Sequence, residues 1–179
     1  MKVFVASSSK VEVNGETVYA IVDGVGGFKG KALKILEENG IHDPKPGQWY
    51  SQQSWLNAFK TIAEQIGNST LYAIGQKIPE NAKFPPEIND IHKALSAIDI
   101  AYQMNHRNGP IGNYIYEKTG DRSAKFTCTN PYPDDFDKGI IVAMAKKFKL
   151  PIFNLQVSID ESKPIRMKGG DSTTFIVTW

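Results

Sequence analysis

Residues Asn113 to Asn130 read NYIYEKTGDRSAKFTCTN and contain two candidate strands. Tyrosines alternate with other residues in the first part of this stretch, and this period of two is typical of a strand. The run Thr119-Gly120-Asp121 then supplies a turn, because glycine and aspartate favour turn conformations. We therefore predict two adjacent strands, over residues 113–118 and 123–130.

A helix and two further strands are predicted downstream. Asp134 or its neighbour can cap a helix that continues to about Lys149, and lysines near its C-terminus complement the helix dipole. Residues 153–159 and 173–179 have the composition of strands. The order strand-strand-helix-strand-strand indicates an antiparallel sheet with a helix packed on it.

A β-hairpin is predicted near the N-terminus. Val11 and Val13 alternate with polar residues, and Asn14-Gly15 then precedes a largely apolar run over residues 17–22. Asn-Gly between two extended segments is a strong hairpin signal, because both residues tolerate positive φ angles. The chain is therefore expected to open with a hairpin.

The rest of the first 112 residues is predicted to be mostly helical. Apolar residues recur there at three- and four-residue steps, which places them on one face of a helix. Ser51 is suited to cap one of these helices, because its hydroxyl can accept a backbone N–H. The predicted helices cover residues 28–39, 51–67, 71–78 and 88–102.

Together these elements predict an α+β fold, in which a helical layer packs on an antiparallel sheet, with an N-terminal hairpin. The length of 179 residues fits one domain, and no shift in composition marks a boundary. We expect a single domain over residues 1–179. Its hairpin and helices occupy residues 1–112, and its strand-strand-helix-strand-strand portion occupies residues 113–179.

Composition and charge argue against several classes of protein. Lys and Arg total 21 and Asp and Glu total 19, so the net charge is only +2, and the scattered basic residues do not support nucleic-acid binding. The single cysteine permits no intramolecular disulfide, as suits a reducing compartment. No run approaches the ~20 apolar residues of a membrane span. We expect a cytoplasmic protein without a membrane span.

No catalytic motif is complete in this chain. The glycine-rich run Gly24–Lys31 lacks both the Walker spacing and the hydroxyl that should follow its lysine, and it also fails the dinucleotide fingerprint. The histidines His42, His92 and His106 include no pair at the i, i+4 spacing of a helical zinc site. With no Gly-x-Ser-x-Gly or zincin pattern either, a non-enzymatic protein is favoured.

Two residues nevertheless keep alternatives open. His106 follows the predicted helix over residues 88–102 and precedes a glycine loop, where pockets often open. It could be an axial haem ligand, or it could simply offset the helix dipole. Cys128 could be a nucleophile if a nearby base or cation lowered its pKa, although a buried structural cysteine is the default interpretation.

The last third of the chain carries a series of short motifs. In order they are Tyr116–Gly120, Cys128–Pro133, a helix with Gly139 near its start, Asp160–Arg166, Gly169–Phe175 and the closing strand Phe175–Trp179. From Tyr114 to Trp179 this layout resembles the 4-vinyl reductase-like small-molecule-binding domain. That domain belongs to a fold group shared with haem nitric-oxide sensors and Golgi-transport tethering subunits. The resemblance implies a cavity between helices and sheet that holds a small, mostly apolar molecule.

The resemblance also bears on metals and cofactors. Many members of that family carry a zinc site, formed by an upstream Cys and a Glu-x-x-Cys-x7-Cys run. Placed on this chain, the run falls at Ser162, Ile165 and Thr173, so only Cys128 remains, and one soft ligand does not hold zinc. The Tyr-x-Ser-x-Arg motif of the haem sensors is absent too. We therefore expect no metal and no cofactor, with haem or another tetrapyrrole as the alternative.

The leading hypothesis is a non-enzymatic sensor domain that binds a small apolar ligand between the helix over residues 88–102 and the first two predicted strands. Such a ligand needs a cavity of about 300 Å³ or more. The signal would pass to a partner protein or through a homodimer. The alternatives are a haem-binding protein or enzyme that uses His106 or Cys128, and a ligand-free adaptor. The expected ligand-binding residues are Tyr102, His106, Arg107, Tyr114, Tyr116, Phe126 and Cys128.

Overall fold

The computed structural model describes residues 1–82, 88–147 and 154–179. Within these ranges the α-helices and two antiparallel sheets confirm the predicted α+β class. The elements in chain order are β1 (Glu12–Asn14), α1 (Gly15–Gly24), η1 (Gly26–Phe28), α2 (Lys29–Glu38), β2 (Trp49–Ser51), α3 (Gln52–Gln65), α4 (Asn68–Asn81), α5 (Ile91–Met104), β3 (His106–Arg107), β4 (Tyr114–Gly120), β5 (Ser123–Cys128), α6 (Asp134–Lys147), β6 (Gln156–Ile159), η2 (Arg166–Lys168) and β7 (Thr173–Thr178), where η marks a 3-10 helix.

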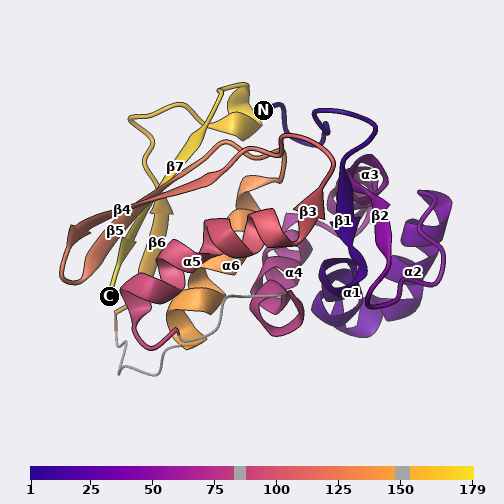
Figure 1. Ribbon diagram of the computed structural model, residues 1–179, viewed down its shortest axis with the longest axis horizontal. Coiled ribbons are helices and arrows are strands. Elements are labelled where there is room, and N and C mark those ends of the chain that lie inside the picture. Colours follow the sequence, from indigo (N-terminus) through magenta and orange to yellow (C-terminus); the bar gives the residue numbers. More distant parts are fainter. Residues whose placement is uncertain (83–87, 148–153) are drawn as a thin grey trace.

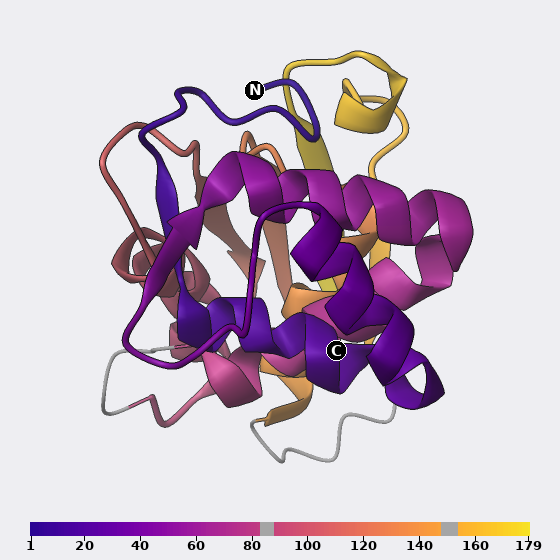
Figure 2. The same cartoon turned by 90° about the vertical axis from the view of Figure 1, so that its right-hand side faces the viewer.

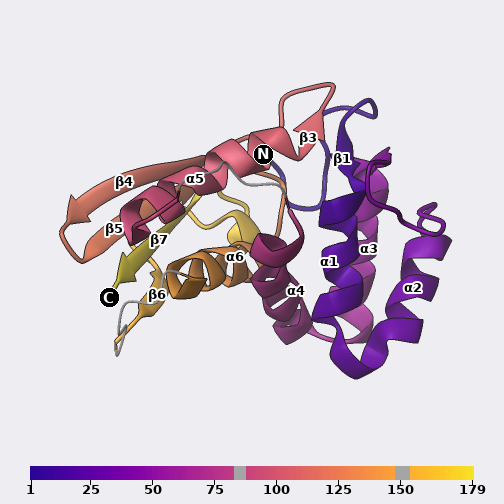
Figure 3. The same ribbon diagram turned by 60° about the horizontal axis from the view of Figure 1, so that its bottom comes forward.

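The C-terminal part has the predicted strand-strand-helix-strand-strand order. Its four strands form an antiparallel sheet in the order β4-β5-β7-β6. Tyr116, Phe126 and Phe175 lie side by side in register across three of these strands. Residues of β5 alternate between buried and half-buried, so the sheet has one covered face. Helices α5 and α6 lie on that face (Figure 3).

The predicted N-terminal hairpin is wrong. Asn14 does not form a turn; it is the N-cap of α1, where its side-chain oxygen accepts the backbone N–H of Thr17 at 3.0 Å. Asparagine serves equally well in either role, so the local signal was ambiguous. The run over residues 17–22 is helical because its apolar face is buried against other helices. Strand β1 pairs instead with the distant strands β2 and β3.

The predicted helices are confirmed with shifted ends. Ser51 caps α3, as expected, by accepting the backbone N–H of Ser54 at 3.3 Å. The helix predicted over residues 71–78 is longer and contains Pro79. The end of the helix predicted to reach Lys149, and the start of the strand predicted from residue 153, lie outside the described residues.

Helix α4 connects the two halves of the molecule. It lies between α1 and α6 (Figure 1) and packs on both of them without intervening side chains. A Cβ added at Gly139 of α6 would lie 2.3 Å from the carbonyl oxygen of Tyr72, and one added at Gly75 would lie 2.2 Å from that of Phe136. On the other side, a Cβ at Gly24 would lie 2.4 Å from the Cα of Ile74. These crossings therefore require glycine.

Helices α1, α2 and α3 and the small sheet β2-β1-β3 lie at the end of the molecule opposite the large sheet (Figure 1), and this end faces the viewer in Figure 2. No helix in the described parts of the chain combines the length and the apolar character that a membrane crossing requires.

The candidate site lies between the helices α1, α2 and α3 on one side and the large sheet on the other.

Candidate functional site

A small cavity lies where α4, α5, α6 and β4 meet. Its volume is about 30 Å³, roughly a tenth of the ~300 Å³ at which ordinary ligand pockets begin. Its position between helices and sheet is the expected one, but its size is not. The lining residues are Thr17, Ile78, Ala82, Ile98, Ala101, Tyr102, Asn105, His106, Tyr114, Tyr132, Phe136 and Ile140.

Aromatic side chains fill most of the space around this cavity. The ring of Tyr102 packs edge-on against the rings of Tyr114 and Tyr132, with centroid distances of 5.2 and 6.0 Å. Tyr132 in turn packs against Phe136 at 5.2 Å. Such contacts are favourable beyond the area that they bury, so the closed arrangement is a stable one.

His106 forms part of the cavity wall. It follows the last turn of α5, and its side chain is buried. Nδ1 lies 2.8 Å from the carbonyl oxygen of Tyr102, which can only accept, so Nδ1 carries the proton. Nε2 is then an acceptor, and the Tyr132 hydroxyl donates to it at 2.7 Å. Burial lowers the pKa of His106 to about 4, so the imidazole is neutral at pH 7.

The Tyr132 hydroxyl has further polar neighbours. Nε2 of Gln52 contacts it at 3.5 Å. Burial raises the pKa of Tyr132, and the contact with the amide of Gln52 opposes this shift. Two buried atoms of these neighbours, Gln52 Oε1 and Trp55 Nε1, make no hydrogen bond within the described parts of the chain. Tyr132 therefore stays protonated at neutral pH. Its polar neighbours Gln52 and Trp55 each keep one buried atom that could form a further hydrogen bond.

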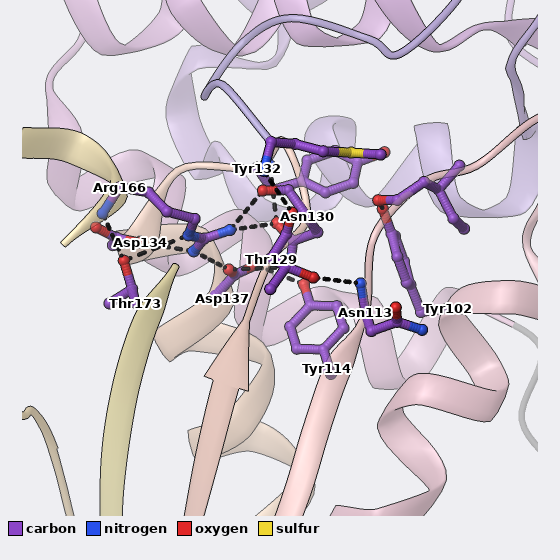
Figure 4. A network of polar contacts seen from close by, with 12 residues as sticks. Tyr102, Asn113, Tyr114, Thr129, Asn130, Tyr132, Asp134, Asp137, Arg166 and Thr173 are labelled. Atoms are coloured by element: carbon purple, nitrogen blue, oxygen red, sulfur yellow. Dashed lines mark hydrogen bonds and ion pairs between the residues drawn. The ribbon is translucent and has the colours of Figure 1, made fainter. Parts of the chain in front are cut away.

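A buried ionic cluster lies beside the cavity (Figure 4). The guanidinium of Arg166 is 2.6 Å from a carboxylate oxygen of Asp134 and 2.6 Å from one of Asp137. It also donates to the backbone and side-chain oxygens of Asn130, both at 2.7 Å. The chain's own oxygens thus satisfy this cation, which is closed to anionic ligands in this arrangement.

Burial shifts the pKa of Asp137, which belongs to this cluster, and that of Cys128, which lies beside it. Burial raises the pKa of Asp137, while Arg166 and the hydroxyl of Tyr114, which donates to the carboxylate, oppose that rise. Burial also raises the pKa of Cys128 well above its usual value. Cys128 is therefore a thiol at neutral pH, and a nucleophilic role would require the opposite shift.

The structure brings three of the expected ligand-binding residues together and leaves four elsewhere. Tyr102, His106 and Tyr114 line the cavity. Phe126 packs within the buried face of the sheet, and Cys128 lies beside the ionic cluster.

The other two expected residues lie farther out. Arg107 is on the surface, where it pairs with Glu12 at 2.6 Å and stacks over the ring of Trp49. The Tyr116 hydroxyl contacts Nδ1 of His92 at 2.5 Å. These two polar groups therefore do not orient a ligand in this cavity.

Sequence reasoning missed Tyr132 and Arg166. Tyr132 stands between two prolines in a predicted loop, and nothing local shows that its hydroxyl meets a histidine 26 residues away. Arg166 finds its carboxylates 29 and 32 residues away. Within the described residues, no three His, Cys, Asp or Glu side chains are placed to hold a metal ion together.

Comparison with known proteins adds to this geometry. No family model matches the chain, and no curated protein matches it. Solved structures do match: an Fe(II) H-NOX protein mutant from S. oneidensis has a TM-score of 0.70 at 14% identity, over 92% of this chain and 95% of that one. The chain has the H-NOX fold.

Two further H-NOX structures agree. An unliganded Fe(II) mutant from K. algicida gives a TM-score of 0.67 at 13% identity, over 92% of this chain and 95% of that chain. A Tt H-NOX mutant gives 0.66 at 13% identity, over 93% and 94%. The likeness covers nearly the whole chain, whereas the sequence suggested one in the last third alone. The 4-vinyl reductase-like label is not confirmed.

The expectation of no cofactor has to be corrected. One matched structure is described by haem redox potential and porphyrin distortion, and another by haem distortion in the H-NOX family. Haem is thus described for proteins that share this fold. The expectation was wrong because it relied on the absence of the Tyr-x-Ser-x-Arg motif. The matched structures share the fold at only 12–14% identity, so a short motif can be lost while the fold is retained.

Proposed function

We propose that the chain is a sensor domain that binds haem or a related tetrapyrrole, with His106 as the axial ligand to iron. The observation that carries this proposal is the orientation of His106. Its Nδ1–H is held by the carbonyl of Tyr102, and metal-ligating histidines almost always donate their second ring N–H in this way. The lone pair of Nε2 then faces the side chains of the cavity.

The donor chemistry of the site fits this group. A ligating imidazole must be neutral, and the lowered pKa of His106 keeps it so at pH 7. The walls are aliphatic and aromatic, as a macrocycle requires. The present volume of about 30 Å³ does not enclose a macrocycle, so binding requires the aromatic side chains around the cavity to move.

Within such a domain, the residues of this chain would have separate roles. When bound, haem would supply an iron centre for a diatomic gas; one matched H-NOX structure is described in an Fe(II)NO state. Tyr102 fixes the tautomer of His106 through its carbonyl, and the apolar walls exclude water. A cytoplasmic location, a partner protein that receives the signal and a homodimer are further parts of the proposal.

The test is a haemin titration of the purified protein, read by absorption and by native mass spectrometry. We expect a Soret band that saturates at one haemin per chain. His106→Ala should lose or shift this band, whereas His92→Ala should keep it, because His92 contacts Tyr116 and Trp179 and does not line the cavity.

Two outcomes would contradict the proposal. A wild-type protein without a Soret band would overturn it and leave the ligand-free adaptor, or, if another small molecule is released, the apolar-ligand sensor. A spectrum unchanged by His106→Ala would remove His106 as the ligand.

A further inference from the structure

The hydroxyl of Tyr132 is hydrogen-bonded to Nε2 of His106, the nitrogen that would ligate iron in the proposed function. We infer that this hydroxyl occupies the position at His106 Nε2 that a ligand must take, so that Tyr132 determines which ligands this pocket accepts. The inference rests on the proposed function, because it concerns the same site.

The hydrogen-bond roles at His106 leave one arrangement. The carbonyl of Tyr102 fixes the proton on Nδ1, at 2.8 Å. Nε2 can then only accept, and the Tyr132 hydroxyl donates to it at 2.7 Å. Both ring nitrogens are therefore used, and any ligand of Nε2 has to displace a hydroxyl of the chain itself.

This arrangement selects ligands by chemical class. Nε2 offers an electron pair, so a competitor must accept one more strongly than a phenolic O–H does. A metal centre with an open coordination position meets this demand. A purely apolar molecule offers Nε2 nothing and leaves Tyr132 in place. Displacement of the Tyr132 hydroxyl from Nε2 therefore favours a metal-bearing ligand over an apolar molecule of similar shape.

The displaced hydroxyl has a new partner close by. Gln52 already contacts it through Nε2 at 3.5 Å, while Oε1 of the same amide is buried and has no hydrogen-bond partner among the described residues. An unsatisfied buried acceptor is costly, so a Tyr132 hydroxyl that leaves His106 and donates to Gln52 Oε1 would recover part of the lost hydrogen bond. The Tyr132 hydroxyl thus has an acceptor in both arrangements: His106 Nε2 when it covers that nitrogen, and Gln52 Oε1 when a ligand displaces it.

The test compares haemin affinity in the wild type, Tyr132→Phe and Tyr116→Phe. Removing the Tyr132 hydroxyl frees Nε2 and keeps the ring, so we expect haemin to bind about five- to tenfold more tightly, the equivalent of one hydrogen bond. Tyr116 forms a similar contact with His92 at 2.5 Å, outside the cavity lining, so Tyr116→Phe is the matched control and should bind like the wild type.

Each outcome decides the inference. Tighter binding by Tyr132→Phe alone supports it, and so does binding by Tyr132→Phe where the wild type binds no haemin. Equal or weaker binding by Tyr132→Phe overturns it and leaves the proposed function standing. Absence of binding in both proteins overturns the proposed function and the inference with it. Should Tyr132→Phe not fold, as judged by circular dichroism, Tyr132→Met removes the same hydroxyl and decides the question by the same criteria.

Discussion

Arg166 and Asp137 form an ion pair of 2.6 Å in which neither side chain is exposed to solvent. The pair joins η2 to α6, and Asp134 and Asn130 complete the hydrogen bonds of the guanidinium. The two carboxylates raise the pKa of Arg166, against the effect of burial, so the cation persists at any pH of interest. The cluster therefore fixes the start of α6 against the end of the sheet.

Arg166→Met is expected to be strongly destabilising. It would leave two buried carboxylates without their cation, and breaking a buried pair in this way typically costs about 3–5 kcal/mol. Urea denaturation at pH 7 measures the change in the free energy of unfolding. Arg107→Met is the control, because it breaks a partly exposed pair with Glu12 that is worth about 0–1 kcal/mol. Equal decreases in the free energy of unfolding of the two variants would show that the buried cluster stabilises the protein no more than the exposed pair does.

His106 makes stability depend on pH. Burial lowers its pKa from 6.5 to about 4, so between these values the unfolded chain binds a proton that the native chain does not. The contribution of neutral His106 to the free energy of unfolding is fully present above pH 6.5. It is lost as the pH falls towards 4, by an amount on the order of 3 kcal/mol. The raised pKa of Asp137 acts in the opposite direction, so the measurement needs a variant for comparison.

That variant is His106→Gln. Its free energy of unfolding, measured by denaturant titration from pH 7 to pH 4.5, should fall less than that of the wild type. Parallel curves for the two proteins would mean that His106 is not buried in its neutral form.

The crossing of α4 and α6 should be sensitive to a single methyl group. In Gly139→Ala the new Cβ would lie 2.3 Å from the carbonyl oxygen of Tyr72, so the helices must separate, at a cost of about 1–3 kcal/mol or more. Gly30→Ala is the matched control, because no atom of the described residues lies within 4 Å of its Cβ position in α2. There alanine should stabilise by about 0.5–1 kcal/mol. Thermal melting should therefore show shifts of opposite sign, and shifts of the same sign would refute the close approach.

Asn14 should matter more than an ordinary helix cap. Its side chain accepts the N–H of Thr17 and also donates to the buried Oδ1 of Asn105 at 2.5 Å. Asn14→Ala is therefore expected to cost more than the ~1 kcal/mol of a lost cap. Ser51→Ala removes a cap alone and supplies the comparison by the same melting experiment. A larger loss in Ser51→Ala would argue against the contact with Asn105.

Local patterns predicted much of the fold. Apolar spacing placed the helices, and the alternating stretch from Asn113 placed the first two strands of the large sheet. The error at Asn14 arose because asparagine before glycine can either turn a chain or cap a helix, and only distant partners decide between them. Strand β1 pairs with residues 49–51 and 106–107, which no local signal reveals.

The candidate site was predicted less well. His106 was recognised from its place after a helix end, and Tyr102 and Tyr114 from the predicted helix and the predicted strand that were expected to enclose the pocket. Arg107 was expected to be a polar group that orients the ligand, yet in the two-residue strand β3 it lies on the surface and pairs with Glu12. Tyr132 could not be found, because its role depends on a hydrogen bond between segments 26 residues apart.

The contacts of α4 also determine how the protein opens to solvent. Ile74 and Gly75 are consecutive, yet one meets the backbone of α1 and the other meets that of α6. No layer of side chains separates the three helices there, so none of them can loosen without removing the support of the next. Their amide hydrogens should consequently exchange as a single cooperative unit that spans both halves of the molecule.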